Sequence, residues 1–311
     1  MALLGVDIGG TKIAIGLASD SGELWQQERF LVSDTQTPEK TLDRVAEIAK
    51  TLAKQREDFG QVGICSPGPF HNGKLSNPAN LPGWDGVDIA QSLSSRLGRP
   101  AYLQNDANAA AVGEWLFGQG KGTKHMAYVT VSTGVGAGLV LNGTPYGGPH
   151  GNAAELGHVV IDVNGPQCNC GLTGCLEALA SGTAIGRSGR QRAASSAFLR
   201  SLHDEGIGAK EVLDGWKAGD AVCSEIVETA ARHLGHGLGI LVNLVNPERI
   251  ALGGGVMNAG APLLDRIRHW TQFYSMPTLF GETDLRLSSL GDSTGLMGAI
   301  AVAMVGDGGK K

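Results

Sequence analysis

Two glycine-rich turns, each between two apolar segments, constrain the fold of this 311-residue chain more than any other feature. The first lies within residues 3–17, with its turn at DIGGTK (7–12). The second lies within residues 129–140, with its turn at STGVG (132–136). Both segments predict β-hairpins, because apolar residues flank paired or closely spaced glycines. Such a repeat predicts two similar domains that each present one hairpin to a cleft.

Both turns carry residue types that can hold phosphate groups. Glycines let backbone N–H groups approach a phosphate, a threonine or lysine adds donors, and an aspartate can hold a magnesium ion. The alternative is a plain glycine hairpin turn. No G-x4-G-K-[ST] or G-x-G-x-x-G segment opens a helix after a strand, so P-loop and Rossmann folds lose their usual support. The candidate residues are Asp7, Gly9, Gly10, Thr11 and Lys12 in the first turn, and Thr133 and Gly134 in the second.

Four side chains that commonly bind metal ions lie close together in the sequence. One imidazole and three thiols match a closed structural zinc site, and the glycines between them allow tight turns. The alternatives are buried thiols or a disulfide. The chain has only five cysteines and no N-terminal segment like a secretory signal, which favours metal binding in a reducing compartment. The four ligands would be His158, Cys168, Cys170 and Cys175, with Glu155 and Glu177 held beside them.

Asp106 lies between a predicted strand at residues 101–103 and an alanine-rich helix. Ligands of open α/β sheets bind beyond the carboxyl ends of the strands, so Asp106 could accept a proton from a substrate hydroxyl. The alternative is a helix N-cap, and one residue can do both. Gly68 and Asn80 belong to two rigid loops, 66–69 and 80–84, that could line a cleft.

The last third of the chain predicts a long helix over residues 221–244 and a strand over 249–252. That strand opens into three consecutive glycines, whose exposed backbone could approach adenine and ribose. An apolar helix follows residue 295, runs to 304 and packs on the first domain, and we expect disorder over 306–311. The three glycines are Gly253, Gly254 and Gly255.

Composition excludes several classes of protein. The net charge of -5 gives no general attraction for nucleic acid, and no apolar run is long enough to span a bilayer. The chain exceeds one typical core, so two domains are expected. Its 48 glycines indicate backbone loops shaped around a ligand.

Taken together, these motifs resemble the ROK family of sugar kinases, transcriptional repressors and uncharacterised reading frames. Seven segments appear in the family's order: 7–12, 80–84, 105–108, 133–136, 155–158, 168–177 and 253–255. The resemblance implies an α/β chain with an actin-like ATPase (ribonuclease-H-like) fold, two domains around a cleft and a structural zinc loop. We expect a small N-terminal domain at 1–117, completed by a C-terminal helix at 295–311. A larger domain at 118–294 would carry the zinc loop.

The resemblance also implies the chemistry. ATP with Mg²⁺ would be bound by the two turns and by Gly253, Gly254 and Gly255, and structural Zn²⁺ by the His-Cys motif. Asp106 would be the base that takes the proton of a hexose 6-hydroxyl. The hexose would be held by Gly68, Asn80, Asn105, Asp106, Glu155, His158 and Glu177.

The expected activity is phosphorylation of glucose to glucose 6-phosphate by ATP. The alternatives are an N-acetylglucosamine or N-acetylmannosamine kinase and a sugar-sensing ROK regulator. A regulator would need a helix-turn-helix domain ahead of the first hairpin, and the hairpin begins by residue 7, so a kinase is favoured. We further expect a cytoplasmic homodimer with no nucleic-acid or membrane partner.

Overall fold

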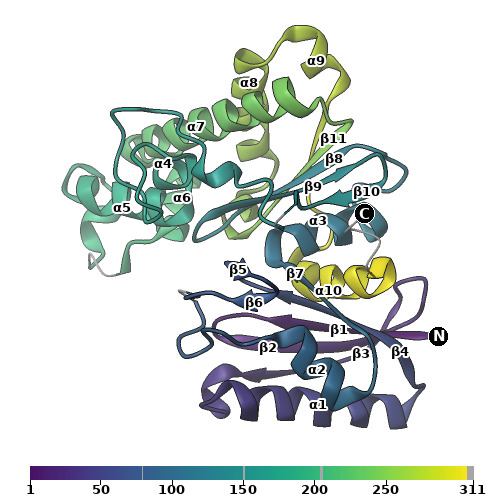
Figure 1. The fold of residues 1–311 in the computed structure, drawn as a ribbon. Coiled ribbons are helices and arrows are strands. Elements are labelled where there is room, and N and C mark those ends of the chain that lie inside the picture. Colours follow the sequence, from purple (N-terminus) through teal and green to yellow (C-terminus); the bar gives the residue numbers. More distant parts are fainter. Residues whose placement is uncertain (79, 150, 204–205, 307–311) are drawn as a thin grey trace. The chain divides into compact units, whose positions relative to one another are not determined.

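The computed structural model describes residues 1–78, 80–149, 151–203 and 206–306 (Figure 1). Contacts within the chain divide it into two units. The first unit comprises Met1–Lys124, Gly138–Ala153 and Ser289–Lys311, and the second comprises His125–Ala137 and Ala154–Ser288. The domain limits at 117/118 and 294/295 stay a prediction.

The first unit contains a five-stranded sheet in the order β3-β2-β1-β4-β7. β1 and β2 form the predicted antiparallel hairpin, and β3 pairs with β2, whereas β4 and β7 run parallel to β1. Bulky apolar residues fill both hairpin strands, which explains why they are buried. The strands are β1 (Ala2–Ile8), β2 (Lys12–Ala18), β3 (Leu24–Leu31), β4 (Phe59–Ser66) and β7 (Ala101–Asn105), with a separate pair β5 (Phe70–His71) and β6 (Lys74–Leu75).

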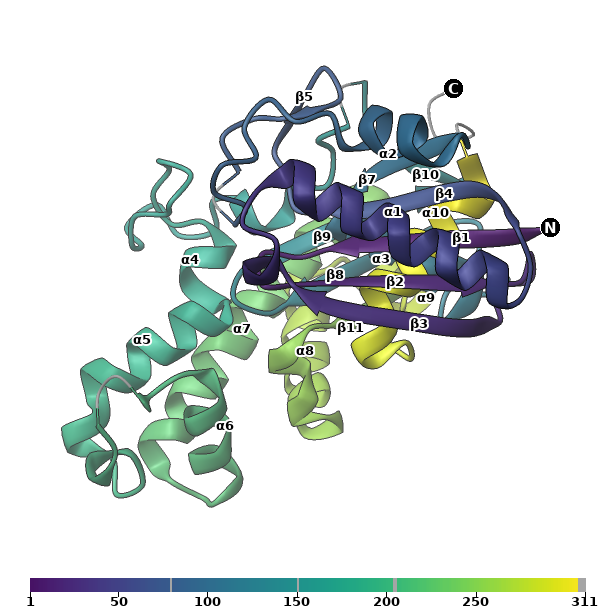
Figure 2. The same cartoon turned by 90° about the horizontal axis from the view of Figure 1, so that it is seen from below.

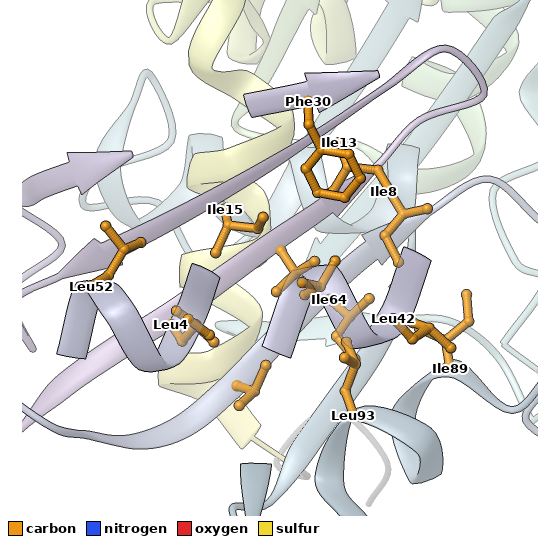
Figure 3. Close-up of a cluster of buried hydrophobic side chains, with 14 of the residues drawn as sticks. Leu4, Ile8, Ile13, Ile15, Phe30, Leu42, Leu52, Ile64, Ile89 and Leu93 are labelled. Atoms are coloured by element: carbon orange, nitrogen blue, oxygen red, sulfur yellow. The ribbon is translucent and has the colours of Figure 1, made fainter. Parts of the chain in front are cut away.

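Helices cover both faces of this sheet (Figure 2). Leu42 and Leu52 of α1 pack with Leu4 and Ile15 in the cluster on one face, drawn in Figure 3. On the other face Ile300 of α10 belongs to a second cluster. The helices are α1 (Pro38–Gln55), α2 (Ile89–Leu97), α3 (Asp106–Phe117) and α10 (Thr294–Val305), with short 3₁₀ turns η1 (Val32–Asp34) and η7 (Gly291–Ser293).

The close approach of α10 to the sheet depends on glycine residues, which have no side chain. A Cβ atom built on Gly63 of β4 would lie 1.9 Å from the carbonyl oxygen of Ala299. On its other side, α10 meets α3 where a Cβ atom on Gly113 would lie 3.0 Å from the Cα atom of Gly298. Glycine therefore lets these backbones touch, and the predicted packing of this helix on the N-terminal region is found.

A second five-stranded sheet has the order β10-β9-β8-β11-β12. β8, β11 and β12 run parallel, and β10 pairs antiparallel with β9. The predicted hairpin strands at 129–140 thus occupy neighbouring places, and the strand expected at 249–252 is present. The strands are β8 (Met126–Val131), β9 (Val135–Leu141), β10 (Thr144–Tyr146), β11 (Arg249–Gly253) and β12 (Asp284–Leu287).

The second unit is rich in helices. The longest matches the predicted helix at 221–244, and Asp220 caps its start by accepting the Cys223 N–H. The helices are α4 (Leu176–Ala180), α5 (Gly182–Arg192), α6 (Ala209–Lys217), α7 (Ala221–Val245), α8 (Ala261–Tyr274) and α9 (Pro277–Glu282). The 3₁₀ turns are η2 (Leu156–His158), η3 (Ala193–Ser195), η4 (Leu199–Ser201) and η6 (Gly255–Ala259).

Within the described ranges, no helix combines the length and apolar character needed to cross a membrane. The final apolar helix ends at Val305, one residue after the predicted end. Of the residues 306–311 that were expected to be disordered, Gly306 is described as the C-cap of α10, whereas residues 307–311 lie outside the described residues.

Candidate active site

Asp7 lies near the end of β1, in register with Cys65 of the parallel strand β4. The Cys65 thiol hydrogen-bonds to the Asp7 carboxylate. Burial raises the pKa of Asp7, and the thiol and Lys12 only partly offset this rise, to which the nearby carboxylate of Asp106 adds. The sequence placed Asp7 within the turn, and this is wrong: Asp7 and Ile8 extend the strand because both pair with β2.

The first glycine turn is therefore shorter than expected, covering residues 9–11. The Gly9 N–H donates to the carbonyl of Lys12 at 3.0 Å and closes it. A Cβ atom on Gly10 would lie 2.5 Å from the carbonyl oxygen of Asn80, so glycine lets the turn touch the 80–84 loop. Thr11 and Lys12 are exposed and can reach a ligand.

Asp106 is the first residue of α3, directly after β7. The N-cap is Asn105, whose Oδ1 accepts the Ala107 N–H at 2.9 Å, and this corrects the alternative in which Asp106 caps the helix. Asp106 Oδ1 accepts the same N–H at 2.8 Å. The Asp106 side chain remains exposed, yet the protein atoms crowded around its carboxyl displace water and raise its pKa, which backbone hydrogen bonds only partly counter.

Gly68 lies beside Asn105. A Cβ atom on Gly68 would be in ordinary contact, at 3.5 Å, with the Asn105 Nδ2 atom and the Phe70 ring. The first unit thus brings together Asp7 with Asp106, Gly10 with Asn80, and Gly68 with Asn105. These are five of the predicted binding residues and the predicted base, drawn from distant parts of the sequence.

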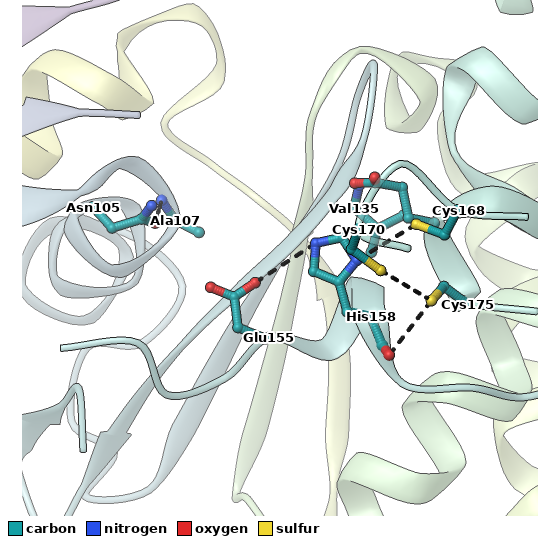
Figure 4. Close-up of polar contacts among 9 residues, drawn as sticks. Asn105, Ala107, Val135, Glu155, His158, Cys168, Cys170 and Cys175 are labelled. Carbon is teal, nitrogen blue, oxygen red and sulfur yellow. Dashed lines mark hydrogen bonds and ion pairs between the residues drawn. The ribbon is translucent and has the colours of Figure 1, made fainter. Parts of the chain in front are cut away.

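In the second unit, the four predicted zinc ligands converge (Figure 4). One ligand atom from each of His158, Cys168, Cys170 and Cys175 lies within 4.8 Å of all the others, and we call these residues the metal group. His158 Nδ1 lies 3.7 Å from Cys168 Sγ, and the Cys170 and Cys175 sulfur atoms are 3.6 Å apart. An isolated antiparallel β-bridge between Val160 and Cys175 closes the loop that carries these ligands.

Three soft thiol ligands and one imidazole suit a structural zinc ion. The Cys168 and Cys175 side chains are buried, which would keep water away from a bound ion. The donors therefore fit the expected metal by type, number and convergence.

Two carboxylates accompany the metal group. Glu155 Oε2 lies 4.0 Å from His158 Nε2, the ring nitrogen that faces away from Cys168. Glu177, in the first turn of α4, accepts the Val135 N–H through Oε2 at 3.0 Å. A Cβ atom on Gly134 would lie 2.3 Å from that same oxygen. The second glycine turn is thus packed directly against Glu177.

The second turn and the glycine triplet differ in their accessibility. Thr133 is exposed, and its carbonyl accepts the Thr183 hydroxyl at 2.8 Å. Gly253 is buried and packs against Tyr128: a Cβ atom on Gly253 would lie 2.4 Å from the Tyr128 hydroxyl oxygen. Gly254 has φ +90°, and only Gly255 is exposed with open space beside it. The expectation that the whole triplet exposes its backbone is therefore wrong, because β11 continues through Gly253 into the sheet.

The model of the ROK family matches residues 3–305 of this sequence. The chain belongs to the ROK family. A relative, the glucokinase of Thermotoga maritima, is 36% identical over 310 residues, which cover 97% of each chain. An N-acetylmannosamine kinase of Haemophilus influenzae is 32% identical over 96% of this chain and 94% of its own.

Among solved structures, the ROK glucokinase of Streptomyces griseus in complex with glucose and AMPPNP has 32% identity and a TM-score of 0.81. The match covers 98% of this chain and all of the other. The family and the two sheets confirm the predicted actin-like ATPase fold. The metal group confirms that this ROK chain carries a Cys₃His motif able to hold a metal ion.

Sequence reasoning missed three residues of the first unit. Cys65 contacts Asp7, Gly295 meets the Asp7 carboxylate, and Glu114 is fully buried on α3. The first two leave no sequence signal, because their contacts join segments far apart in the chain. Glu114 does leave one, since it is an ionisable residue that follows the apolar stretch 109–113 inside a predicted helix.

Proposed function

We propose that this protein is a glucokinase that transfers the γ-phosphoryl group of ATP to the 6-hydroxyl of glucose. The observation that carries the proposal is the similarity to glucokinases over nearly the full length of both chains. The exposed Asp106 carboxyl at a strand–helix junction supports it, because this is where α/β folds place ligands.

Asp106 is assigned as the general base. Burial raises its pKa, which makes its ionised form a better proton acceptor than an ordinary aspartate. It takes the proton from the 6-hydroxyl as the bond to phosphorus forms. Phosphoryl transfer asks little covalent chemistry of a protein, so positioning and electrostatics supply most of the rate.

The sugar-binding residues are assigned in two groups. In the first unit, Gly68 lies beside Asn105, the residue that precedes the base, and Asn80 lies against Gly10. In the second unit, Glu155 and His158 lie beside the metal group, and Glu177 keeps one carboxylate oxygen besides the one that accepts the Val135 N–H. Amides and carboxylates suit a sugar because each hydroxyl both donates and accepts, and a buried partner left unpaired is costly.

ATP with Mg²⁺ is assigned to the glycine turns. Asp7 fits a magnesium ion because it offers hard carboxylate oxygens, and its raised pKa reflects a site in which a cation would relieve unfavourable burial. Bound Mg²⁺ neutralises charge on the phosphates. The phosphate and nucleotide contacts come from Gly9, Gly10, Thr11, Lys12, Thr133, Gly134, Gly253, Gly254 and Gly255, with Gly255 the most accessible of the triplet.

Zn²⁺ is assigned to the metal group in a structural role. His158 would bind through Nδ1, the nitrogen near Cys168, leaving Nε2 to face Glu155 and the sugar. Metal binding then fixes the tautomer of the ring. Because zinc needs thiolates, we place the enzyme in the reducing cytoplasm, and we retain the homodimer as the oligomeric state.

The second candidate is an N-acetylmannosamine kinase, favoured by the similarity to the Haemophilus influenzae enzyme. The small residues Ala153 and Ala154 ahead of Glu155 leave space, and the described residues 151–154 provide no apolar wall for an acetyl methyl group, which favours glucose.

A coupled ADP-release assay with glucose, mannose, fructose, N-acetylglucosamine and N-acetylmannosamine tests the proposal. We expect glucose to have the highest kcat/KM. A contact to the 2-hydroxyl predicts that 2-deoxyglucose loses about ten- to a hundredfold in kcat/KM. If no sugar in this panel causes release of ADP, the protein is not a sugar kinase. Faster turnover of an N-acetyl sugar would reject only the assignment of glucose as the substrate.

A further inference from the structure

Glu114 is a fully buried carboxylate to which the proposed mechanism gives no role. It lies on α3, the helix that begins with Asp106. A buried charge is costly unless it finds hydrogen-bond donors. Glu114 finds them in the backbone: Oε2 accepts the Gln119 N–H at 2.8 Å, and Oε1 accepts the N–H groups of Ser289 at 3.1 Å and Leu290 at 3.3 Å.

These donors belong to distant segments of the first unit. Gln119 comes after Gly118, the C-cap of α3, whereas Ser289 begins the last segment of the unit. The chain also makes room for the contact, since a Cβ atom on Gly118 would lie 2.1 Å from Glu114 Oε2. The carboxylate thus holds the connector before α10 against the end of α3.

A tight turn links this connector to α10. The carbonyl of Leu290 accepts the Ser293 N–H at 3.1 Å, and the carbonyl of Gly291 accepts the Thr294 hydroxyl at 2.6 Å. α10 starts at Thr294. Because both hydrogen bonds span only three residues, they hold residues 290–294 in one tight turn. The position of the Leu290 N–H therefore sets where the helix begins.

The start of α10 lies against Asp7. A Cβ atom on Gly295 would be 2.3 Å from Asp7 Oδ2 and 2.7 Å from its Cγ atom. The first turn of a helix carries free N–H groups and partial positive charge, which favour a neighbouring carboxylate. The position of α10 therefore constrains the Asp7 carboxylate.

We propose that Glu114 is a positioning residue for Asp7. By holding the Ser289 and Leu290 N–H groups, it sets the start of α10 and, through Gly295, the orientation of the carboxylate assigned to Mg²⁺. The inference rests on the proposed function, because it gives Asp7 its role in binding magnesium–ATP. A purely stabilising Glu114 would affect folding alone.

The test is Glu114→Gln, which keeps the shape but replaces one acceptor oxygen with an NH₂ group facing an N–H donor. Three quantities are measured: the Kd of Mg·ADP by calorimetry, the half-saturating Mg²⁺ concentration in the kinase assay, and the Kd of glucose. We expect the first two to rise at least about fivefold, as for one lost hydrogen bond, and the third to change less than about twofold.

The matched control is Asp220→Asn. This carboxylate also accepts backbone N–H groups, from Cys223 at 2.9 Å and Phe198 at 3.1 Å, but it lies in the second unit with no contact to Asp7 or α10 among the contacts described. We expect it to lower Tm and leave the Kd of Mg·ADP unchanged.

A second variant, Gly118→Ala, keeps the carboxylate and displaces it with a methyl group. It should raise the same two constants, and it decides the matter if Glu114→Gln fails to fold. Unchanged Mg·ADP and Mg²⁺ constants in the folded variants, with a lower Tm as in the control, overturn the inference alone. A wild-type protein that does not bind Mg·ADP overturns the proposed function and the inference with it.

Discussion

The carboxylate of Glu177 accepts the backbone N–H of Val135 at 3.0 Å, although 42 residues separate them in the sequence. Glu177 follows the ligand Cys175 by two residues, and Val135 follows Gly134 of the second glycine turn. This hydrogen bond therefore joins the helix that follows the metal group to the turn assigned to ATP. Loosening either partner should affect the other.

For the metal group, we expect one tightly bound zinc ion per chain. Replacing any one ligand, as in Cys168→Ser, Cys170→Ser or Cys175→Ser, should lower both zinc content and Tm. Structural zinc binding contributes about 10 to 16 kcal/mol in small peptides, so even part of it matters to a domain. Elemental analysis and thermal unfolding measure the two effects. Cys223→Ala is the control, because this buried thiol lies outside the metal group and should leave the zinc content unchanged. A zinc-free wild type with full stability would contradict the assignment.

For the second turn, Gly134→Ala should push the Glu177 carboxylate away from Val135. The new Cβ atom would lie 2.3 Å from Oε2, so the hydrogen bond is lost at a cost of about 0.5 to 1.5 kcal/mol. Denaturant unfolding should show this loss, together with a higher KM for ATP. Gly281→Ala is the matched control, because no atom lies within 4 Å of the Cβ position at Gly281. The free energy of unfolding of this variant should not fall. Equal behaviour of the two variants would argue against the contact.

For the base, Asp106→Asn should reduce kcat roughly 10²- to 10⁴-fold while glucose still binds, since the amide keeps the shape but cannot take the proton. In the wild type, the raised pKa of Asp106 predicts an acid limb of kcat/KM above the ordinary aspartate range, with activity lost as the carboxylate is protonated. Asp88→Asn, an exchange at the cap of α2 in the same unit, should keep activity. A variant at Asp106 with more than about a tenth of wild-type kcat would exclude the base role.

For Asp7, the pKa is raised in the folded protein, so the folded state binds the proton more tightly than the unfolded state does. Stability is then highest below the unfolded pKa and falls as pH rises through the folded pKa. Asp7→Asn should therefore raise Tm at neutral pH, and the gain should vanish in acid. Thermal unfolding against pH, without ligands, measures it.

The pKa of Asp220 is shifted in the opposite direction to that of Asp7, so its effect on stability has the opposite pH dependence. Burial acts to raise its pKa, but hydrogen bonds from the Cys223 and Phe198 N–H groups outweigh burial and lower the pKa to about 2. Its stabilisation is present above the unfolded pKa and is lost as pH falls toward 2, so Asp220→Asn should lower Tm at neutral pH. Both variants shifting Tm in the same direction would refute the burial argument for Asp7.

Local patterns in the sequence were sufficient wherever the interacting residues are close in the chain. The metal group converges because successive ligands are at most ten residues apart and the glycines between them permit tight turns. The first hairpin and the helix at 221–244 follow from residue periodicity alone. Even there, element boundaries differed from the prediction. Asp7 belongs to β1, and the N-cap of α3 is Asn105 rather than Asp106. Neighbouring polar residues can each occupy a boundary position, and tertiary packing decides which of them does.

Contacts between remote segments were decided only by the tertiary structure. Glu114 meets Leu290, Gly295 meets Asp7, and Glu177 meets Val135 across gaps that no periodicity spans. The sequence by itself predicted which residues carry the chemistry, since motif spacing is a local property. Only the fold decided which of them touch, because a buried carboxylate pairs with whichever backbone N–H the packing of helices and sheets brings within reach.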